Sequence, residues 1–242
     1  MSHHLLDVRD LRHAYPDGTL ALDGPTFTLH HGEAVALVGA NGAGKSTLLK
    51  HLNGSLRPTA GEVRVGELPV HPGTLAQIRR TVGMVFQDPD DMLFMPTVLE
   101  DVAFGPRNQG FPVGEADARA LEALQQVGAA HLAAKAPYHL SMGEKRRCAL
   151  AAVLAMAPDI LVLDEPSTGL DPRGRRLLVD LLRAFTHTRV LATHDLDLAL
   201  RLCPRTLVLH RGRLVADGPT REILADRARM EAWELEAWPP EG

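Results

Sequence analysis

The chain has 242 residues, of which 45% are hydrophobic and 23% charged, and its formal net charge is −4. These values are typical of a globular protein with a substantial core and exclude a disordered chain, and the net charge supplies no basic field for a nucleic-acid partner. The amino terminus lacks the apolar stretch of a signal peptide, and no apolar run approaches the roughly 20 residues of a membrane-spanning helix. Two cysteines make no disulfide framework, so a soluble, cytosolic protein is expected.

The first motif along the chain is a glycine-rich loop between an expected strand and an expected helix. The run EAVALVG has the length of a strand, and KSTLLKHLNG has helical spacing that ends at Gly54. The loop between them fits G-x-x-x-x-G-K-[ST], in which backbone N–H groups and a helix N-terminus converge on phosphate oxygens. The lysine is expected to reach the β- and γ-phosphates, and the first hydroxyl to bind Mg²⁺. The predicted nucleotide-binding residues here are Gly39, Ala40, Asn41, Gly42, Ala43, Gly44, Lys45, Ser46 and Thr47.

A second motif, DILVLDEPSTGLD, places two carboxylates after an apolar run. The residues ILVL at 160–163 indicate a strand that is buried on both faces of a parallel sheet. Ligands of open α/β sheets bind at the carboxyl ends of such strands. Asp164 is therefore predicted to serve the Mg²⁺ site, and Glu165 to orient or deprotonate an attacking water.

Two further segments make the chain resemble the ABC-family ATPases. HLSMGEKRRCALAAVLAMAPD lies between the two motifs, and RVLATHDLDLALRL follows them. The glycine loop, a serine before a basic amphipathic helix, the acidic strand and a strand that ends in Thr193-His194-Asp195 occur in the family's order. The resemblance covers residues 5 to about 224 and implies an enzyme that hydrolyses ATP with Mg²⁺.

The resemblance also implies the fold. It is an α/β P-loop NTPase fold of the ABC ATPase type, with a mainly parallel core sheet, an N-terminal antiparallel β subdomain and an inserted helical subdomain. Residues 1–242 are expected to form one nucleotide-binding domain, with the ATP-binding core in 1–88 and 158–242 and the helical subdomain in 89–157. GEVRVGELPV reads as a hairpin, PTREILADR as a late helix, and the acidic tail RARMEAWELEAWPPEG receives no function.

Individual roles carry over to positions that match the family's motifs. Tyr15 corresponds to the aromatic residue that stacks on adenine, Gln87 to the glutamine that senses Mg²⁺ and the γ-phosphate, and His194 to the histidine that contacts the γ-phosphate. Asp171 corresponds to the residue that links two nucleotide sites across a dimer. The implied catalytic set is Lys45, Gln87, Glu165 and His194, and the implied Mg²⁺ ligands are Ser46, Gln87 and Asp164.

The segment Ser141-Met142-Gly143-Glu144 departs from the family's commonest form, which has glycine and glutamine in place of Met142 and Glu144. Ser141 is a good N-cap, and with the N–H of Gly143 it can complete a γ-phosphate site. In this family ATP lies between the Lys45 loop of one subunit and this segment of another. The resemblance therefore implies a second ATPase subunit, either in a homodimer or as a paralogue. Glu144 brings a negative charge nearer the phosphates than glutamine would.

The run QDPDDMLFMP, followed by PTVLEDVAFGPRNQG, resembles the ATPases of energy-coupling-factor importers, including the cobalt and nickel systems. That resemblance implies an integral membrane scaffold subunit, a separate substrate-capture subunit for cobalt, nickel or a vitamin, and a position at the cytoplasmic face of the cell membrane. The scaffold's coupling helix is expected to contact the apolar residues Met92, Leu93, Phe94 and Met95, and the acidic residues Asp88, Asp90 and Asp91 are expected to meet basic groups at the rim. The alternative is that the apolar residues tuck under the helical insert.

The remaining alternative is a soluble ABC ATPase of DNA repair, chromosome maintenance or translation. Proteins of that class usually carry coiled-coil insertions, zinc motifs or a duplicated domain. This sequence contains no heptad array, no cysteine cluster and no internal repeat. It therefore favours the ATP-hydrolysing motor subunit of an ABC importer.

Overall fold

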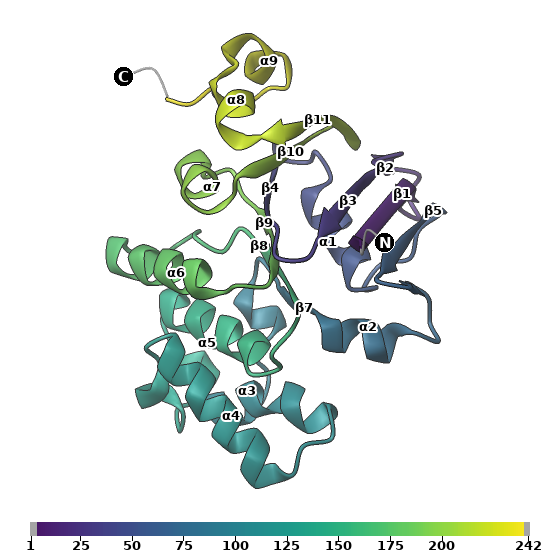
Figure 1. The fold of residues 1–242 in the computed structure, drawn as a ribbon. Helices are drawn as coiled ribbons and strands as arrows, with labels where there is room; N and C mark the ends of the chain where they lie inside the picture. Colours follow the sequence, from purple (N-terminus) through teal and green to yellow (C-terminus); the bar gives the residue numbers. More distant parts are fainter. Residues whose placement is uncertain (1–3, 240–242) are drawn as a thin grey trace. The chain divides into compact units, whose positions relative to one another are not determined.

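The computed structural model describes residues 4–239, and Figure 1 shows its ribbon. Its contacts divide the chain into two compact units. The first unit combines Met1–Val82 with Thr186–Gly242, and the second unit is Gly83–Phe185. The first unit is therefore assembled from the two ends of the chain, whereas the second is continuous in sequence.

The first unit contains an antiparallel sheet near the amino terminus (Figure 1). The central strand β1 pairs with β2, β3 and β5, and β5 also pairs with β6. The β5–β6 pair confirms the predicted hairpin. The bounds are β1 (His4–Ala14), β2 (Leu20–Asp23), β3 (Phe27–His30), β5 (Ala60–Val65) and β6 (Leu68–Pro69).

A bulge in β1 changes which side chains face the core. Leu6 and Val8 are fully buried before it, and Leu11 and His13 are buried after it, so the inward-facing positions switch from even to odd numbers. The pairing of β1 with β5 shifts register here, and Asp10 adopts a positive φ of 44°. One extra residue in a strand moves every later side chain to the opposite face. This shift turns His13 inward.

The first unit also contains a mainly parallel set of strands, in the order β11-β10-β4-β9. β4 (Ala34–Val38) is buried throughout and pairs in parallel with β9 (Thr188–Ala192) and with β10 (Arg205–His210), while β11 (Arg213–Pro219) is antiparallel to β10. Burial on both faces explains the continuous apolar run of β4. Because Leu37 is aligned with Ala192, the segments that follow β4 and β9 leave the same edge of the sheet.

Five helices of the described first unit accompany these strands. The helix after β4 starts at Lys45, as the glycine-loop motif predicts, and the late helix expected in PTREILADR is confirmed. The start of the acidic tail forms a further short helix. The bounds are α1 (Lys45–Leu52), α2 (Leu75–Thr81), α7 (Leu196–Leu202), α8 (Thr220–Ala225) and α9 (Arg227–Ala232).

The second unit has two buried neighbouring strands, β7 (Val82–Val85) and β8 (Ile160–Asp164). Strand β7 begins one residue before the unit, and the apolar run ILVL lies within β8, as predicted. Helices α3 (Val98–Asn108), α4 (Val113–Gln126) and α5 (Met142–Leu154) pack against one another. The remaining elements are the 3₁₀ turns η1 (Pro89–Asp91), η2 (Ala130–Leu132) and η3 (Pro137–His139) and the helix α6 (Pro172–Ala184).

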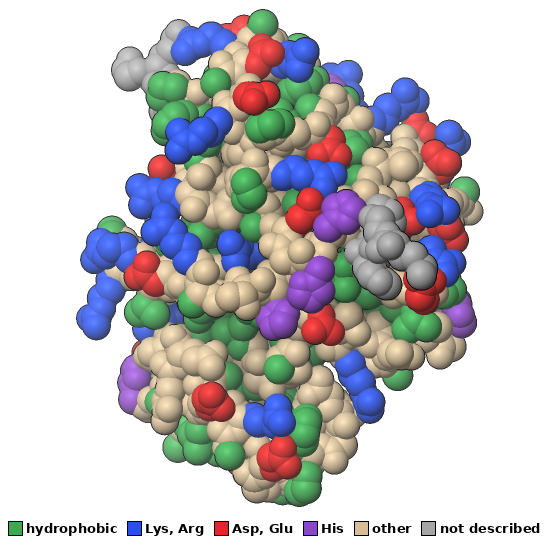
Figure 2. Space-filling view, viewed as in Figure 1, with side chains coloured by type: hydrophobic (Ala, Val, Ile, Leu, Met, Phe, Trp, Pro, Cys, Tyr) green, Lys and Arg blue, Asp and Glu red, His purple; other side chains and the backbone are tan. Residues whose placement is uncertain are grey.

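Helix α6 is amphipathic. Leu178, Val179 and Leu182 are buried, whereas Arg173, Arg176 and Arg183 are exposed. Figure 2 shows blue side chains gathered where Figure 1 places α6. The apolar stripe thus anchors the helix in the second unit and leaves the arginines in solvent.

The two cysteines of the chain are free and buried, Cys148 on α5 and Cys203 at the end of α7. Burial raises the pKa of each thiol to about 12. A thiol must ionise before it reacts as a nucleophile, so both sulfur atoms behave as small apolar core groups.

Two histidines form a buried polar pair between β1 and α1. The Nδ1 atom of His51 lies 2.7 Å from the carbonyl oxygen of Thr47, so it must donate, and the Nε2 atom of neutral His51 is an acceptor. The Nδ1 atom of His13 lies 3.2 Å from that Nε2 atom and 3.1 Å from the carbonyl oxygen of Arg57, so it is the donor to both. A proton on Nε2 of His51 would set two N–H groups against each other. The hydrogen bonds of His51 therefore require its neutral form.

This pair predicts a loss of stability in acid. Burial lowers the pKa of His51 below its ordinary value of 6.5, so below pH 6.5 the unfolded chain takes up a proton that the folded chain refuses. The contribution of His51 to the free energy of unfolding is fully present above about pH 6.5. It is lost as the pH drops toward the folded-state pKa, at up to about 1.4 kcal/mol per pH unit. Denaturant unfolding between about pH 7.5 and 5.5, the range in which histidine titrates, measures this loss of stability. His51→Asn keeps a donor toward Thr47 and should flatten the slope, whereas the exposed control His131→Asn should not. Equal slopes in all three proteins would contradict this account.

Candidate functional site

The glycine loop of the first unit runs from Gly39 to Gly44, between β4 and α1. At Gly39 and Gly44 its backbone lies so close to neighbouring backbone that a side chain is excluded. A Cβ atom on Gly39 would lie 2.3 Å from the carbonyl oxygen of Leu209, and one on Gly44 would lie 2.5 Å from that of Ala21. Gly44 also has a φ of 103°, which favours glycine. The loop therefore presents main-chain groups at the N-terminus of α1, which is the arrangement that binds phosphate.

Lys45 is the first residue of α1, and its side chain folds back over the loop. Its Nζ atom donates to the carbonyl oxygens of Gly39, at 2.6 Å, and of Ala40, at 3.2 Å. Only 8% of the residue is exposed. The ammonium group is thus held at the loop, where it can balance phosphate charge. Ser46, the predicted Mg²⁺ ligand, is half-buried at the next position.

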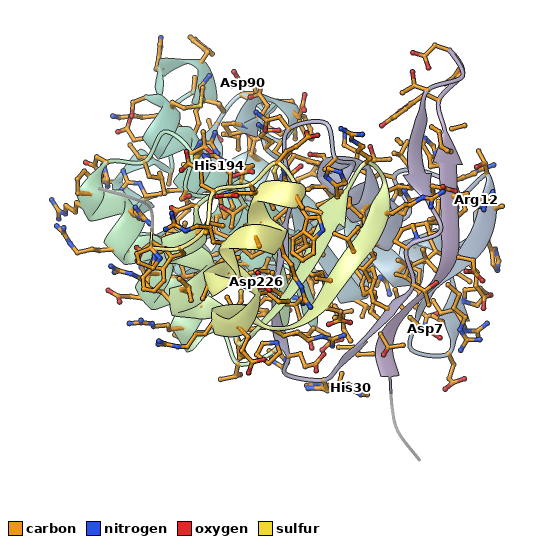
Figure 3. All side chains as sticks on the ribbon, turned by 90° about the horizontal axis from the view of Figure 1, so that it is seen from above. Asp7, Arg12, His30, Asp90, His194 and Asp226 are labelled. Atoms are coloured by element: carbon orange, nitrogen blue, oxygen red, sulfur yellow. The ribbon has the colours of Figure 1, made fainter. Side chains whose placement is uncertain are left out.

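Tyr15 and His194 belong to the same unit as the loop. The hydroxyl group of Tyr15 is hydrogen-bonded to Oγ1 of Thr47 at 2.9 Å, which ties the turn after β1 to α1. His194, labelled in Figure 3, is exposed and lies two residues beyond the end of β9. The parallel register of β4 and β9 starts its segment at the edge where the glycine loop begins. The structure thus gathers Tyr15, the loop and the His194 segment in the first unit.

The second unit holds Gln87, Asp164 and Glu165 at the ends of its two neighbouring strands. Gln87 is exposed and follows β7, whereas Asp164 and Glu165, at the end of β8, are 2% and 6% exposed. Glu165 has a positive φ of 49°. This conformation costs a side-chain-bearing residue on the order of 1–3 kcal/mol, so the surrounding structure must hold it.

Arg146 on α5 contacts this strained residue, and sequence reasoning did not identify it. Its Nη1 atom donates to the carbonyl oxygen of Glu165 at 3.2 Å. The guanidinium group is half-buried, and within residues 4–239 its buried Nε atom has no hydrogen-bond partner. Burial lowers the pKa of Arg146, while the charges of Asp88 and Glu165 oppose that shift. The sequence shows three consecutive cations at 145–147 but not which of them turns inward.

Ser141 caps α5, as predicted, through a reciprocal pair with Glu144. The backbone N–H and the hydroxyl group of Ser141 each donate to Oε2 of Glu144 at 2.8 Å. In turn, the backbone N–H of Glu144 donates to the hydroxyl oxygen of Ser141 at 3.4 Å. These hydrogen bonds hold the pKa of Glu144 below its usual range. Ser141 and Met142 are exposed, and a Cβ atom on Gly143 would meet open space. The start of α5 is accordingly open to solvent.

The same helix-start pattern recurs elsewhere in the second unit. Thr97 and Glu100 form an equivalent pair at the start of α3. Asp171, expected to link nucleotide sites across a dimer, caps α6 by accepting the N–H of Gly174 at 2.6 Å. The structure thus gives Asp171 a local role, and its role across a dimer stays a prediction.

The loop that follows Gln87 differs in part from its expected form. Leu93 is buried, with 7% of its surface exposed, whereas Phe94 is 61% exposed. Phe94 stacks edge to face on Phe104 of α3, which is itself 40% exposed, with ring centres 5.2 Å apart. The expectation that Leu93 offers outward contact was wrong because it packs in the core, and Phe104 was missed.

The acidic residues of this loop are also partly engaged within the chain. Asp90, labelled in Figure 3, accepts a hydrogen bond from Nζ of Lys145 at 2.6 Å. Asp88 caps η1 by accepting the N–H of Asp90. Asp101 on α3 is buried and accepts the N–H groups of Phe94, at 2.8 Å, and Met95, at 2.9 Å. The loop is thus held from α3 and α5, and Phe94 is held outward.

No helix within residues 4–239 is long and apolar enough to cross a membrane.

Comparison with known proteins connects these features. The ABC transporter family model matches residues 22–168, more than half of the chain. A protein of Geobacter sulfurreducens, provisionally named an ABC transporter ATP-binding protein, is 63% identical over 236 residues. The match covers 98% of this chain and 95% of the length of that relative. The energy-coupling factor transporter ATP-binding protein EcfA of Methanothermobacter thermautotrophicus is 49% identical over 228 residues, covering 92% of this chain and 73% of its own.

Two solved structures share the fold. CbiO1 from Clostridium perfringens, part of the ABC transporter complex CbiONQ, has a TM-score of 0.80 at 37% identity and covers 95% of this chain and 94% of its own. A dimeric ATP-binding cassette in a post-hydrolysis state, bound to ADP and phosphate, has a TM-score of 0.83 at 28% identity, with coverages of 89% and 98%. The predicted fold class, with its mainly parallel sheet, antiparallel N-terminal sheet and helical subdomain, is confirmed. This chain belongs to the ABC transporter family, and it is an ATP-binding, ATP-hydrolysing subunit related to the energy-coupling-factor ATPases.

Proposed function

We propose that the chain is the motor subunit of an energy-coupling-factor importer for cobalt, nickel or a vitamin. The observation that carries this proposal is that one chain holds both a phosphate loop, whose lysine is buried, and a second, exposed helix start at Ser141. The loop is one half of a nucleotide site, and the exposed helix start is the half that a neighbouring subunit can use. The likeness to EcfA and to a member of CbiONQ supports the transporter type.

In this proposal, ATP binds between two ATPase subunits, which are two copies of this chain or this chain and a paralogue. Lys45 and the loop N–H groups bind the phosphates, Tyr15 stacks on adenine, and His194 contacts the γ-phosphate. Ser141 and Gly143 of the other subunit complete the γ-phosphate site. The dimeric cassette bound to ADP and phosphate supports this arrangement.

Glu165 is proposed to orient the attacking water. Its burial and its place at the end of β8 suit a carboxylate that accepts a proton at a defined point. Ser46, Gln87 and Asp164 offer hydroxyl, amide and carboxylate oxygens, the donor types that Mg²⁺ prefers, so this donor set fits the ion. When bound, Mg²⁺ would neutralise charge on the phosphates.

The assignment of Glu165 predicts a specific defect. Glu165→Gln keeps the size of the side chain but removes the base, so ATP hydrolysis should fall about 10²–10⁴-fold, or roughly 3–5 kcal/mol in the barrier. Binding of a fluorescent ATP analogue should remain, because the loop and Tyr15 are untouched. Phosphate release measures the rate. A variant that turns over at the normal rate would remove Glu165 from this role.

The shared site predicts a different defect for Ser141→Arg. A bulky cation at the exposed helix start should block the approach of the other subunit and reduce turnover to background. Affinity of the isolated chain for ATP should be unchanged, because Lys45 and Tyr15 belong to the first unit. Thr97→Arg is the matched control, since it removes the same type of cap from α3 but should keep turnover. If Ser141→Arg weakened ATP binding to the isolated chain, the two-subunit site would be refuted.

The exposed pair Phe94 and Phe104 is proposed to receive the membrane scaffold subunit. Aromatic side chains that are held outward are typical anchors of protein interfaces. Asp101 and Lys145 hold the loop from two helices, so movement of the partner can reach α5. The substrate-capture subunit, rather than this chain, would then select the ion or vitamin.

Changing Phe94 and Phe104 together to Asp tests this contact. Co-purification with a co-expressed scaffold subunit should fall about tenfold or more, because two buried charges would replace two anchors. Val113 and Leu121 are exposed apolar residues of the same unit, and their double change to Asp is the control that should assemble normally. Assembly of the Phe94/Phe104 variant at the control level, with substrate uptake intact, would place the scaffold elsewhere.

A further inference from the structure

The contact between Arg146 and Glu165 joins two parts of the second unit that have separate proposed tasks. Arg146 lies on α5, five residues after the cap residue Ser141. Glu165 is the carboxylate proposed to orient water. The hydrogen bond from Nη1 of Arg146 reaches the main-chain carbonyl oxygen of Glu165, not its carboxylate. The arginine therefore acts on the backbone from which the carboxylate projects.

That backbone is in a conformation that needs support. A φ of 49° lies in the left-handed region, which side-chain-bearing residues adopt only when their surroundings impose it. The carbonyl group of Glu165 leads directly into the segment PSTGLD, and its direction depends on the same φ that sets the direction of the Cα–Cβ bond. A charged donor on this oxygen favours one orientation of the peptide over the alternatives.

The guanidinium group is placed to act as more than packing. It is half-buried, and the negative charges of Asp88 and Glu165 both favour its charged form against the burial that disfavours it. The preceding residue, Lys145, binds Asp90 of the loop after Gln87. Of two adjacent side chains of α5, one thus holds the loop that carries Phe94, and the other holds the backbone of Glu165.

We propose that Arg146 is a positioning residue for hydrolysis, which holds Glu165 in its left-handed conformation and thereby couples the position of α5 to the aim of the carboxylate. The proposal rests on the role proposed above for Glu165. When α5 moves toward the nucleotide of the other subunit, Arg146 moves with it and carries the Glu165 carbonyl group. A carboxylate that is misplaced by about 1 Å can lose on the order of 10² in rate.

Two substitutions at this position separate hydrogen bonding from packing. Arg146→Met keeps the apolar stem but removes the donor, so kcat should fall about 10- to 100-fold while KM for ATP stays within about twofold. Arg146→Lys restores a cationic donor and should retain more of kcat than Arg146→Met. Arg107→Met is the matched control, because Arg107 is a partly exposed arginine of the same unit that is paired with Asp117. It should keep kcat, and thermal unfolding of each variant checks the fold.

A double variant tests whether Arg146 acts through Glu165. In the Glu165→Gln background there is no base left to position, so adding Arg146→Met should slow single-turnover hydrolysis of radiolabelled ATP by less than about twofold. A structural role would instead lower the rate by the same factor in both backgrounds. Multiplying effects, an equal loss in Arg107→Met, or normal kcat in Arg146→Met would each overturn the proposal. Normal turnover in Glu165→Gln alone would instead refute the proposed role of Glu165.

Discussion

The structure depends on the close approach of backbone to backbone around the glycine loop. Gly39 lies against the carbonyl group of Leu209, and Gly44 against that of Ala21, at separations that no Cβ atom can enter. These contacts come from β10 and β2, so strands of both sheets of the first unit fix where the loop runs. The buried parallel strand β4 then delivers the loop to the start of α1. Both the phosphate-binding loop and the close packing around it thus require glycine at these two positions.

In the second unit, helix α5 makes the contacts on which the proposed site depends. Its exposed first residues form a helix start that is capped by the Ser141–Glu144 pair. In the same helix, Lys145 contacts Asp90 and Arg146 contacts Glu165. Because these contacts belong to one rigid helix, our proposal expects a displacement at one of them to reach the others. The apolar remainder of the helix, which includes Cys148, holds it against α3 and α4. One helix therefore contacts two of the groups to which we have assigned a role in the second unit, the loop that carries Phe94 and the backbone of Glu165.

The strands, the glycine loop and the cap at Ser141 were predictable because each has a local pattern: a continuous apolar run, a fixed glycine spacing, a polar residue before a helical repeat. Three features had no such pattern. Leu93 and Phe94 are adjacent in an irregular loop, where no period tells the buried residue from the exposed one. Arg146 is the middle of three cations, and only the elements packed on α5 decide which turns inward. His13 faces the core because a bulge changes the alternation of β1, and a bulge is invisible in composition.

The two buried thiols have a practical consequence for spectroscopy. Cys148 and Cys203 are buried, and burial raises the pKa of each thiol to about 12, so neither readily presents the thiolate that attacks maleimide or nitroxide reagents. A third cysteine placed on an exposed helix face would therefore react selectively in the natural chain. Probes on α4 and α6 could then follow the subunit through its catalytic cycle without first replacing the native cysteines, whose removal would open cavities in the core.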